Sequence, residues 1–123
     1  MREHNRDKGR LQHIIECIER IKRYSQGCSL EELIADDMRY YAIVKNLEII
    51  GEAANMLTQD FCDAHPETQW KMIIKMRNYI VHEYFNIDND VVWDVINKDL
   101  PELETQVNQY LNETNWEDWN NQQ

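Results

Sequence analysis

The stretch from Met38 to Thr58, MRYYAIVKNLEIIGEAANMLT, decides the fold that the sequence predicts. Its apolar residues recur most of the way round a helical wheel, which predicts one long central helix over about residues 37–58. Gly51 falls inside this helix, where a glycine costs about 1 kcal/mol relative to alanine. We therefore expect another helix to approach closely at Gly51.

The segments on either side of this stretch also predict helices. Apolar residues repeat with helical spacing over about residues 6–24, at Leu11, Ile14, Ile15, Ile18 and Ile21. Ser29 followed by Glu32 has the spacing of a capping box and predicts a short helix. Further helices are expected over residues 68–85 and over about 90–112. Asp88 or Asn89 is expected to cap the latter.

We predict an all-α fold class, a single-domain helical bundle of about four to five main helices spanning residues 1–123. Pro101 does not suit a helix interior, so a kink or brief break is expected there, with Asp99 capping the second piece.

Residues 112–123 form a polar C-terminal tail that we expect to be frayed or disordered. Trp116 and Trp119 are unusual in such a tail, and they could dock on the body of the protein or on a partner.

Composition places the chain among intracellular proteins. The three cysteines show no paired spacing, which argues against a disulfide framework and for a reducing compartment. No apolar run approaches the roughly 20 residues that span a bilayer, and the N-terminal MREHNRDKGR has no apolar signal core. We expect a cytoplasmic protein with no membrane association.

The net charge of −10 is distributed unevenly. Residues 29–66 carry a balance of −6 and residues 86–123 a balance of −8, whereas residues 67–85 carry three Lys/Arg against two Asp/Glu. A polyanion could approach this non-acidic segment and would be repelled by the acidic ones. The alternative is that any acidic protein contains such a segment by chance.

The non-acidic segment contains MRNYIVHEYF, Met76 to Phe85. A neutral imidazole such as that of His82 can accept a proton near pH 7. A guanidinium such as that of Arg77 can hold a phosphate through two hydrogen bonds. Together these groups could cleave RNA without a metal, using the 2′-hydroxyl of the substrate as nucleophile. Lys71 and Lys75 are candidate contacts to the RNA backbone, with plain surface as the alternative.

Spacing alone does not establish this site. On a continuous helix Arg77 and His82 project roughly 140° apart, so a second copy of the chain could be needed to complete the set. Asn78 and His82 do face the same way. Glu48 and Glu52 face either the site or solvent. His4, His13 and His65 lack the neighbouring carboxylates of a metal site, so no metal or cofactor is expected.

The arrangement Arg77-Asn78-x-x-x-His82-x-Tyr84-Phe85 resembles the signature of the HEPN superfamily, and more closely that of HepT toxins from MntA/HepT toxin–antitoxin systems. The resemblance extends over about residues 6–111. It includes the blocks Asn46–Ala53, His65-Pro66 before Trp70, Val92–Val95, and Asp99–Pro101.

The resemblance implies a homodimer that acts as a metal-independent endoribonuclease. It implies that Arg77 and His82 are catalytic, that Asn78 supports them, and that an MntA-like nucleotidyltransferase antitoxin attaches AMP units to Tyr84. An AMP at Tyr84 would add bulk and negative charge beside the site and repel RNA.

Two further interpretations remain. The chain could be a non-catalytic HEPN module that binds this nucleotidyltransferase or is modified by it. It could also be a helical domain with no site, which would require the blocks of similarity to be accidental.

Overall fold

The computed structural model describes residues 3–122, and all regular structure in that range is helical. The four long helices are α1 (Asp7–Ser25), α3 (Asp37–Asn55), α5 (Trp70–Glu83) and α7 (Leu100–Glu113). The shorter elements are η1 (His4–Arg6), α2 (Leu30–Ala35), α4 (Gln59–Ala64), α6 (Asn89–Asp94), η2 (Val95–Asp99) and α8 (Trp116–Asn121). The predicted all-α fold class is confirmed. None of the described helices is both long enough and apolar enough to cross a membrane.

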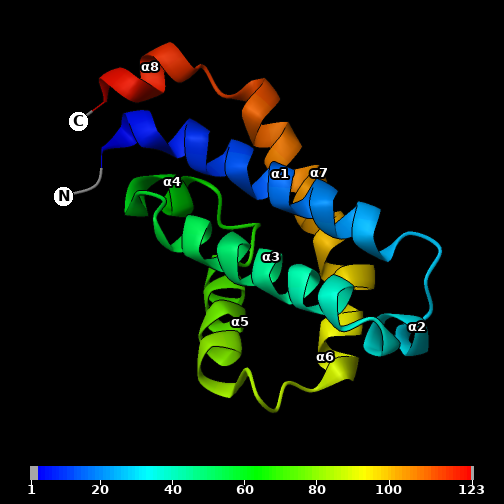
Figure 1. Ribbon diagram of the computed structural model, residues 1–123. Helices are drawn as coiled ribbons and strands as arrows, with labels where there is room; N and C mark the ends of the chain where they lie inside the picture. The colour runs from blue at the N-terminus through cyan, green and yellow to red at the C-terminus, as the bar shows by residue number, and fades with distance from the viewer. Residues whose placement is uncertain (1–2, 123) are drawn as a thin grey trace.

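Helix α3 lies at the centre, as its apolar pattern predicts. It packs against α1 on one side and α5 on the other, while α7 packs along α1. Figure 1 shows α5 projecting away from α3, with a loop leading from its far end across to α6. The chain then returns through α7 to α8, so both ends of the described chain lie at the same end of the molecule (Figure 1).

Side-chain caps begin five of the described helices, namely α2, α3, α4, α6 and α8. The Ser29 hydroxyl accepts from the backbone N–H of Glu32 at 3.2 Å, and the Glu32 carboxylate accepts from the N–H of Ser29 at 3.0 Å. This reciprocal pair is the predicted capping box. Asp88, one of the two predicted caps, accepts from the N–H of Asp90 at 2.9 Å. Thr58 and Asn115 cap α4 and α8 in the same manner.

The close approach expected at Gly51 occurs against α5. A methyl group on Gly51 would overlap Cβ of Arg77 and would lie 3.1 Å from the carbonyl oxygen of Ile73. Real side-chain carbons do not come so near, so the crossing of α3 and α5 at this separation requires glycine. The same contact fixes the point at which the Arg77 side chain leaves the core.

The segment before Pro101 corrects one expectation. Asp99 makes no side-chain cap, and its backbone is helical, so there is no capped break. Instead, residues 95–99 form a π-helical segment, η2, that runs directly into α7. Pro101 lies in the first turn of α7, where its missing N–H is tolerated, and the wider π turn before it accommodates the irregularity.

The structure of the C-terminal residues corrects the expectation that the tail is frayed or disordered. Residues 112–122 are not frayed: α7 continues to Glu113, and α8 follows from Trp116. The Trp116 ring stacks on Phe61 at a centroid distance of 6.0 Å, and Trp119 meets the edge of Phe61 at 5.5 Å. Sequence alone left docking on the body or on a partner open, and the structure shows both tryptophans on the body.

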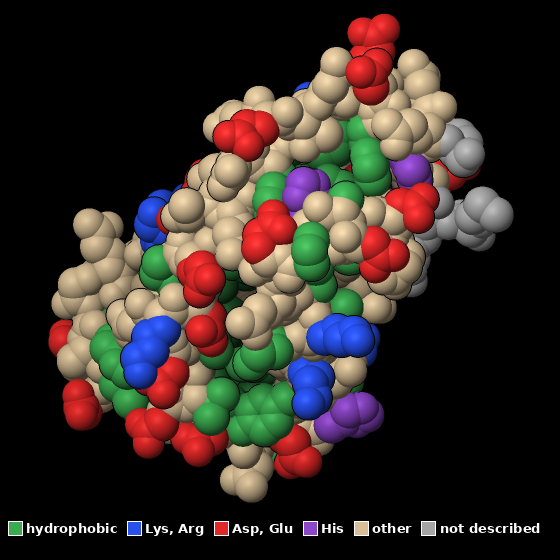
Figure 2. Space-filling view, turned by 180° about the vertical axis from the view of Figure 1, so that it is seen from behind, with side chains coloured by type: hydrophobic (Ala, Val, Ile, Leu, Met, Phe, Trp, Pro, Cys, Tyr) green, Lys and Arg blue, Asp and Glu red, His purple; other side chains and the backbone are tan. Residues whose placement is uncertain are grey.

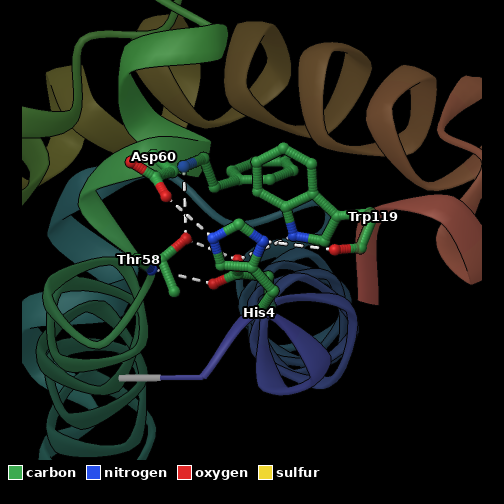
Figure 3. A network of polar contacts seen from close by, with 6 residues as sticks. His4, Thr58, Asp60 and Trp119 are labelled. Carbon is green, nitrogen blue, oxygen red and sulfur yellow. Dashed lines mark hydrogen bonds and ion pairs between the residues drawn. The ribbon is translucent and has the colours of Figure 1, made fainter. Parts of the chain in front are cut away.

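A network of polar contacts, here called the terminal clasp, ties the two ends of the chain to α4. It consists of His4, Asp7, Thr58, Asp60 and Trp119. The carboxylate of Asp7 is fully buried and accepts from the Thr58 N–H at 2.8 Å, the Thr58 hydroxyl at 2.6 Å and the Trp119 indole at 3.0 Å. Figure 3 shows the His4 ring between Asp60 and Trp119. The ring stacks on the indole at 4.5 Å.

Both nitrogens of His4 lie against acceptors. Nε2 is 2.8 Å from the Asp60 carboxylate, and Nδ1 is 3.2 Å from the carbonyl oxygen of Trp119. Desolvation lowers the pKa of His4, but the bonds to Asp60 and Trp119 and the charges of Asp60 and Asp7 outweigh it, so the pKa is raised above 6.5. Only the imidazolium donates to both acceptors at once.

This raised pKa predicts a stability change with pH. Because the folded-state pKa lies above the unfolded value, the contribution of His4 is complete below about pH 6.5 and is lost as the pH rises through the folded pKa. We expect His4→Gln to lower the free energy of unfolding more at pH 6 than at pH 9, measured by urea denaturation. His13→Gln, at an exposed position of α1, is the control. An equal cost at both pH values would contradict the charged clasp.

Candidate functional site

Helix α5 presents the predicted site residues on two different sides. Lys71, Lys75, Asn78 and His82 follow one another at intervals of four, three and four residues, which places them on one stripe of the helix. All four are exposed. Arg77 lies away from this stripe, on the side that packs against α3.

One face of the molecule combines acidic side chains with a group of basic ones. Figure 2 shows acidic side chains scattered over the face seen from behind, with basic side chains next to a histidine near its lower right edge. Because Figure 2 is turned by 180° from Figure 1, this edge corresponds to the lower left of Figure 1, where α5 lies. The non-acidic segment of the sequence therefore forms a local surface that a polyanion can approach.

Arg77 is held from two directions. Its guanidinium lies 3.7 Å from the Glu52 carboxylate and donates to the amide oxygen of Asn78 at 3.0 Å. Its side chain is 34% exposed, so a ligand can still reach it. Of the two carboxylates that the sequence left open, Glu52 pairs with Arg77, whereas Glu48 pairs with Lys45 at 3.4 Å.

His82 is exposed in the last turn of α5, and its imidazole makes no hydrogen bond or ion pair within residues 3–122. The structure therefore joins Arg77 to Asn78 and leaves His82 apart from both. The imidazole is open to solvent, and within the described residues it makes no hydrogen bond to the Arg77 guanidinium.

Tyr84 lies just past the helix, at its C-cap. Its side chain is 54% exposed, and its ring packs on Phe85 at a centroid distance of 4.0 Å. The hydroxyl makes no hydrogen bond to any other described residue, so it is accessible to a modifying enzyme.

Tyr79 has a role that the sequence did not reveal. Its hydroxyl accepts from the backbone N–H of Asp88 at 2.8 Å, which ties the loop after Tyr84 back to α5. Nothing in the spacing of Tyr79 distinguishes this role from that of an ordinary core aromatic. Within residues 3–122 no cluster of three or more His, Cys, Asp or Glu side chains could hold a metal ion.

A family model described as Ribonuclease HepT-like matches residues 14–110. The chain belongs to this family. The predicted resemblance to the HepT family is thereby confirmed, and the match covers α3, α5 and every predicted site residue.

Individual relatives agree with the family assignment. A protein of Caldanaerobacter subterraneus subsp. tengcongensis, named "Putative RNase TTE0752", is 42% identical over 82% of this chain and 90% of its own length. The Thermococcus cleftensis protein "Probable ribonuclease HepT" is 35% identical over 78% of this chain and 87% of its own. "Putative RNase MJ1380" of Methanocaldococcus jannaschii is 32% identical over 81% and 92%. No solved structure matches the chain significantly.

Proposed function

We propose that this HepT-like chain is a metal-independent endoribonuclease and the toxin component of a cytoplasmic toxin–antitoxin system. The observation that carries the proposal is the exposed His82, which has no hydrogen-bond or ion-pair partner among residues 3–122 and lies on the same stripe as Lys71 and Lys75. Family membership and the ribonuclease names of the relatives support it.

The proposed chemistry uses the 2′-hydroxyl of RNA. His82 accepts the 2′-hydroxyl proton as the 2′-oxygen bonds to phosphorus. The bond from phosphorus to the 5′-oxygen breaks, leaving a 2′,3′-cyclic phosphate, and the departing oxygen takes a proton from water. Arg77, supported by Asn78, stabilises the charge on the phosphoryl oxygens.

A homodimer would complete this arrangement. Within one chain His82 and Arg77 do not meet, and α5 itself carries exposed apolar side chains at Met72 and Val81. A second copy would cover apolar surface and bring two α5 helices to one site. We expect a sedimentation mass of two chains at micromolar concentration, and a mass of one chain would contradict the dimer.

The proposed regulation acts at Tyr84. An MntA-like nucleotidyltransferase would transfer AMP to the exposed hydroxyl, with the nucleotide α-phosphorus bonding to the Tyr84 oxygen and pyrophosphate leaving. The added phosphate would lie two residues beyond His82 and would repel the RNA backbone.

The alternative is a non-catalytic module that binds the nucleotidyltransferase or is modified by it. One observation favours it: in the single chain the Arg77 guanidinium is already engaged by Glu52 and Asn78. Cleavage of RNA by the purified, unmodified protein separates the two proposals.

We expect three substitutions to impair three different properties: the cleavage rate, RNA affinity and modification by AMP. His82→Ala should lower the cleavage rate by about 10²–10⁴ because the proton acceptor is lost. Arg77→Ala should lower both cleavage and RNA affinity. Tyr84→Phe should cleave RNA but gain no AMP mass from the nucleotidyltransferase and ATP. Cleavage assays and mass spectrometry provide the measurements.

Matched substitutions at exposed positions control these variants. His13→Ala should cleave RNA normally, and Tyr41→Phe should still gain AMP. If His82→Ala cleaves as fast as wild type, the catalytic role is wrong. If Tyr84→Phe still gains AMP, the modification site is wrong.

We expect Lys71 and Lys75, on the exposed stripe of α5, to contact the RNA backbone. We expect Lys71→Glu combined with Lys75→Glu to weaken RNA binding and to reduce the slope of log affinity against log salt by about 1.4, roughly 0.7 for each lost contact to single-stranded RNA. The same charge change on α1, Lys8→Glu with Arg23→Glu, is the control. A larger loss from the α1 pair would place the RNA path there.

A further inference from the structure

A groove borders the proposed site on the far side of Tyr84. It lies between the first half of α3 and the segment that joins α5 to α6, and its volume is about 450 Å³. Aromatic side chains from both elements line it, among them Tyr41 on α3 and Tyr84 and Phe85 on the connecting segment. Tyr84 belongs both to this groove and to the HepT-like motif, so the groove adjoins the motif.

The aromatic side chains of the groove are unusually exposed. Phe85 is 88% exposed and Tyr41 is 68% exposed. Large apolar side chains left open together generally mark a binding surface. Flat aromatic faces beside a phosphate-approaching helix suit the stacking of an unpaired nucleobase, since every base presents a π-face.

The groove is formed before any ligand arrives. The hydroxyl of Tyr40 on α3 donates to the side-chain oxygen of Asn89, and the hydroxyl of Tyr79 on α5 accepts from the N–H of Asp88. These two hydrogen bonds tie the connecting segment to both long helices. A base entering the groove therefore does not have to order the segment first.

The charge of the groove differs from that of the α5 stripe. Asp37 and Glu48 line it, and its lysine, Lys45, is ion-paired with Glu48 at 3.4 Å. These carboxylates disfavour a phosphate but accept hydrogen bonds from an exocyclic amino group. The phosphates of an RNA strand are therefore favoured along Lys71 and Lys75, and a neutral base is favoured in the groove.

We infer that this groove binds the unpaired base of the nucleotide next to the cleaved phosphate, and that it prefers bases bearing an exocyclic amino group over uracil. This specificity rests on the proposed ribonuclease function. The base stacks on Tyr41 and Phe85, while Asp37, one helical turn before Tyr41 on the same face of α3, accepts from the amino group. Adenine, cytosine and guanine carry that group, and uracil does not.

Cytidine and uridine oligomers test the preference, because their bases match in size and differ in the amino group. Affinities of six-nucleotide oligomers would be measured by fluorescence anisotropy in the His82→Ala chain, in which cleavage is suppressed. We expect tighter binding of the cytidine oligomer. Tyr41→Ala and Phe85→Ala should each weaken binding by about 5- to 150-fold, the range for loss of one base–aromatic stack.

Three further variants make the test specific. Met38→Ala, at an 86% exposed position one turn before Tyr41 that does not line the groove, should leave affinity unchanged. Tyr41→Trp should retain affinity because it keeps the aromatic face. Asp37→Asn should remove the preference for cytidine without abolishing stacking.

The outcomes separate this inference from the proposed function. If wild type cleaves RNA but Tyr41→Ala and Phe85→Ala bind both oligomers as tightly as their parent, the base site is wrong and the ribonuclease stands. If those variants lose the dimer mass in sedimentation but keep the cytidine preference, the groove is an interface between copies and the inference falls. If wild type neither binds nor cleaves RNA, both proposals fall.

Discussion

The contact between Gly51 and Arg77 is the constraint on which the proposed site depends. It sets the separation of α3 and α5, because a side chain at Gly51 would overlap Cβ of Arg77. The backbone approach leaves Arg77 at the edge of the crossing, with its guanidinium between Glu52 and Asn78. A packing requirement in the core thus determines where a charged group emerges on the surface.

The rest of α5 follows from that crossing. Once the Arg77 side is packed on α3, the stripe of Lys71, Lys75, Asn78 and His82 is turned outward. Ile80 lies on the packed side and is 1% exposed, which anchors the last turn before the helix ends. Tyr79 then fastens the following loop through Asp88. One helix therefore supplies a packed face, an exposed basic stripe and one wall of an aromatic groove.

The predictable features were those encoded by local patterns. Helical periodicity predicted the long helices, Ser29 and Glu32 predicted a capping box, and the interior glycine predicted a close helix approach, although not that Arg77 would meet it. The unpredictable features depend on contacts distant in sequence. His4 and Trp119 are 115 residues apart, so no local pattern could show that they join.

Contacts between residues distant in sequence also explain which features of the candidate site could not be predicted. The motif singled out Arg77, His82 and Tyr84, but the partner of Arg77 lies on another helix, and the groove beside Tyr84 needs α3 for one wall. The irregular start of α7 was placed near Pro101, but as a capped break. A proline in the sequence predicts that the helix is irregular at that point. It does not predict whether a side-chain cap or a π-helical turn accommodates the irregularity.

The most direct test of this account is substitution of Gly51 by alanine, with unfolding free energy and RNA cleavage both measured. We predict that Gly51→Ala lowers the unfolding free energy by about 1–3 kcal/mol, the usual cost of overpacking, and reduces cleavage because Arg77 is displaced. Gly9→Ala, at a helical position with nothing within 4 Å of the added carbon, should keep both. Wild-type stability and cleavage in Gly51→Ala would contradict the account.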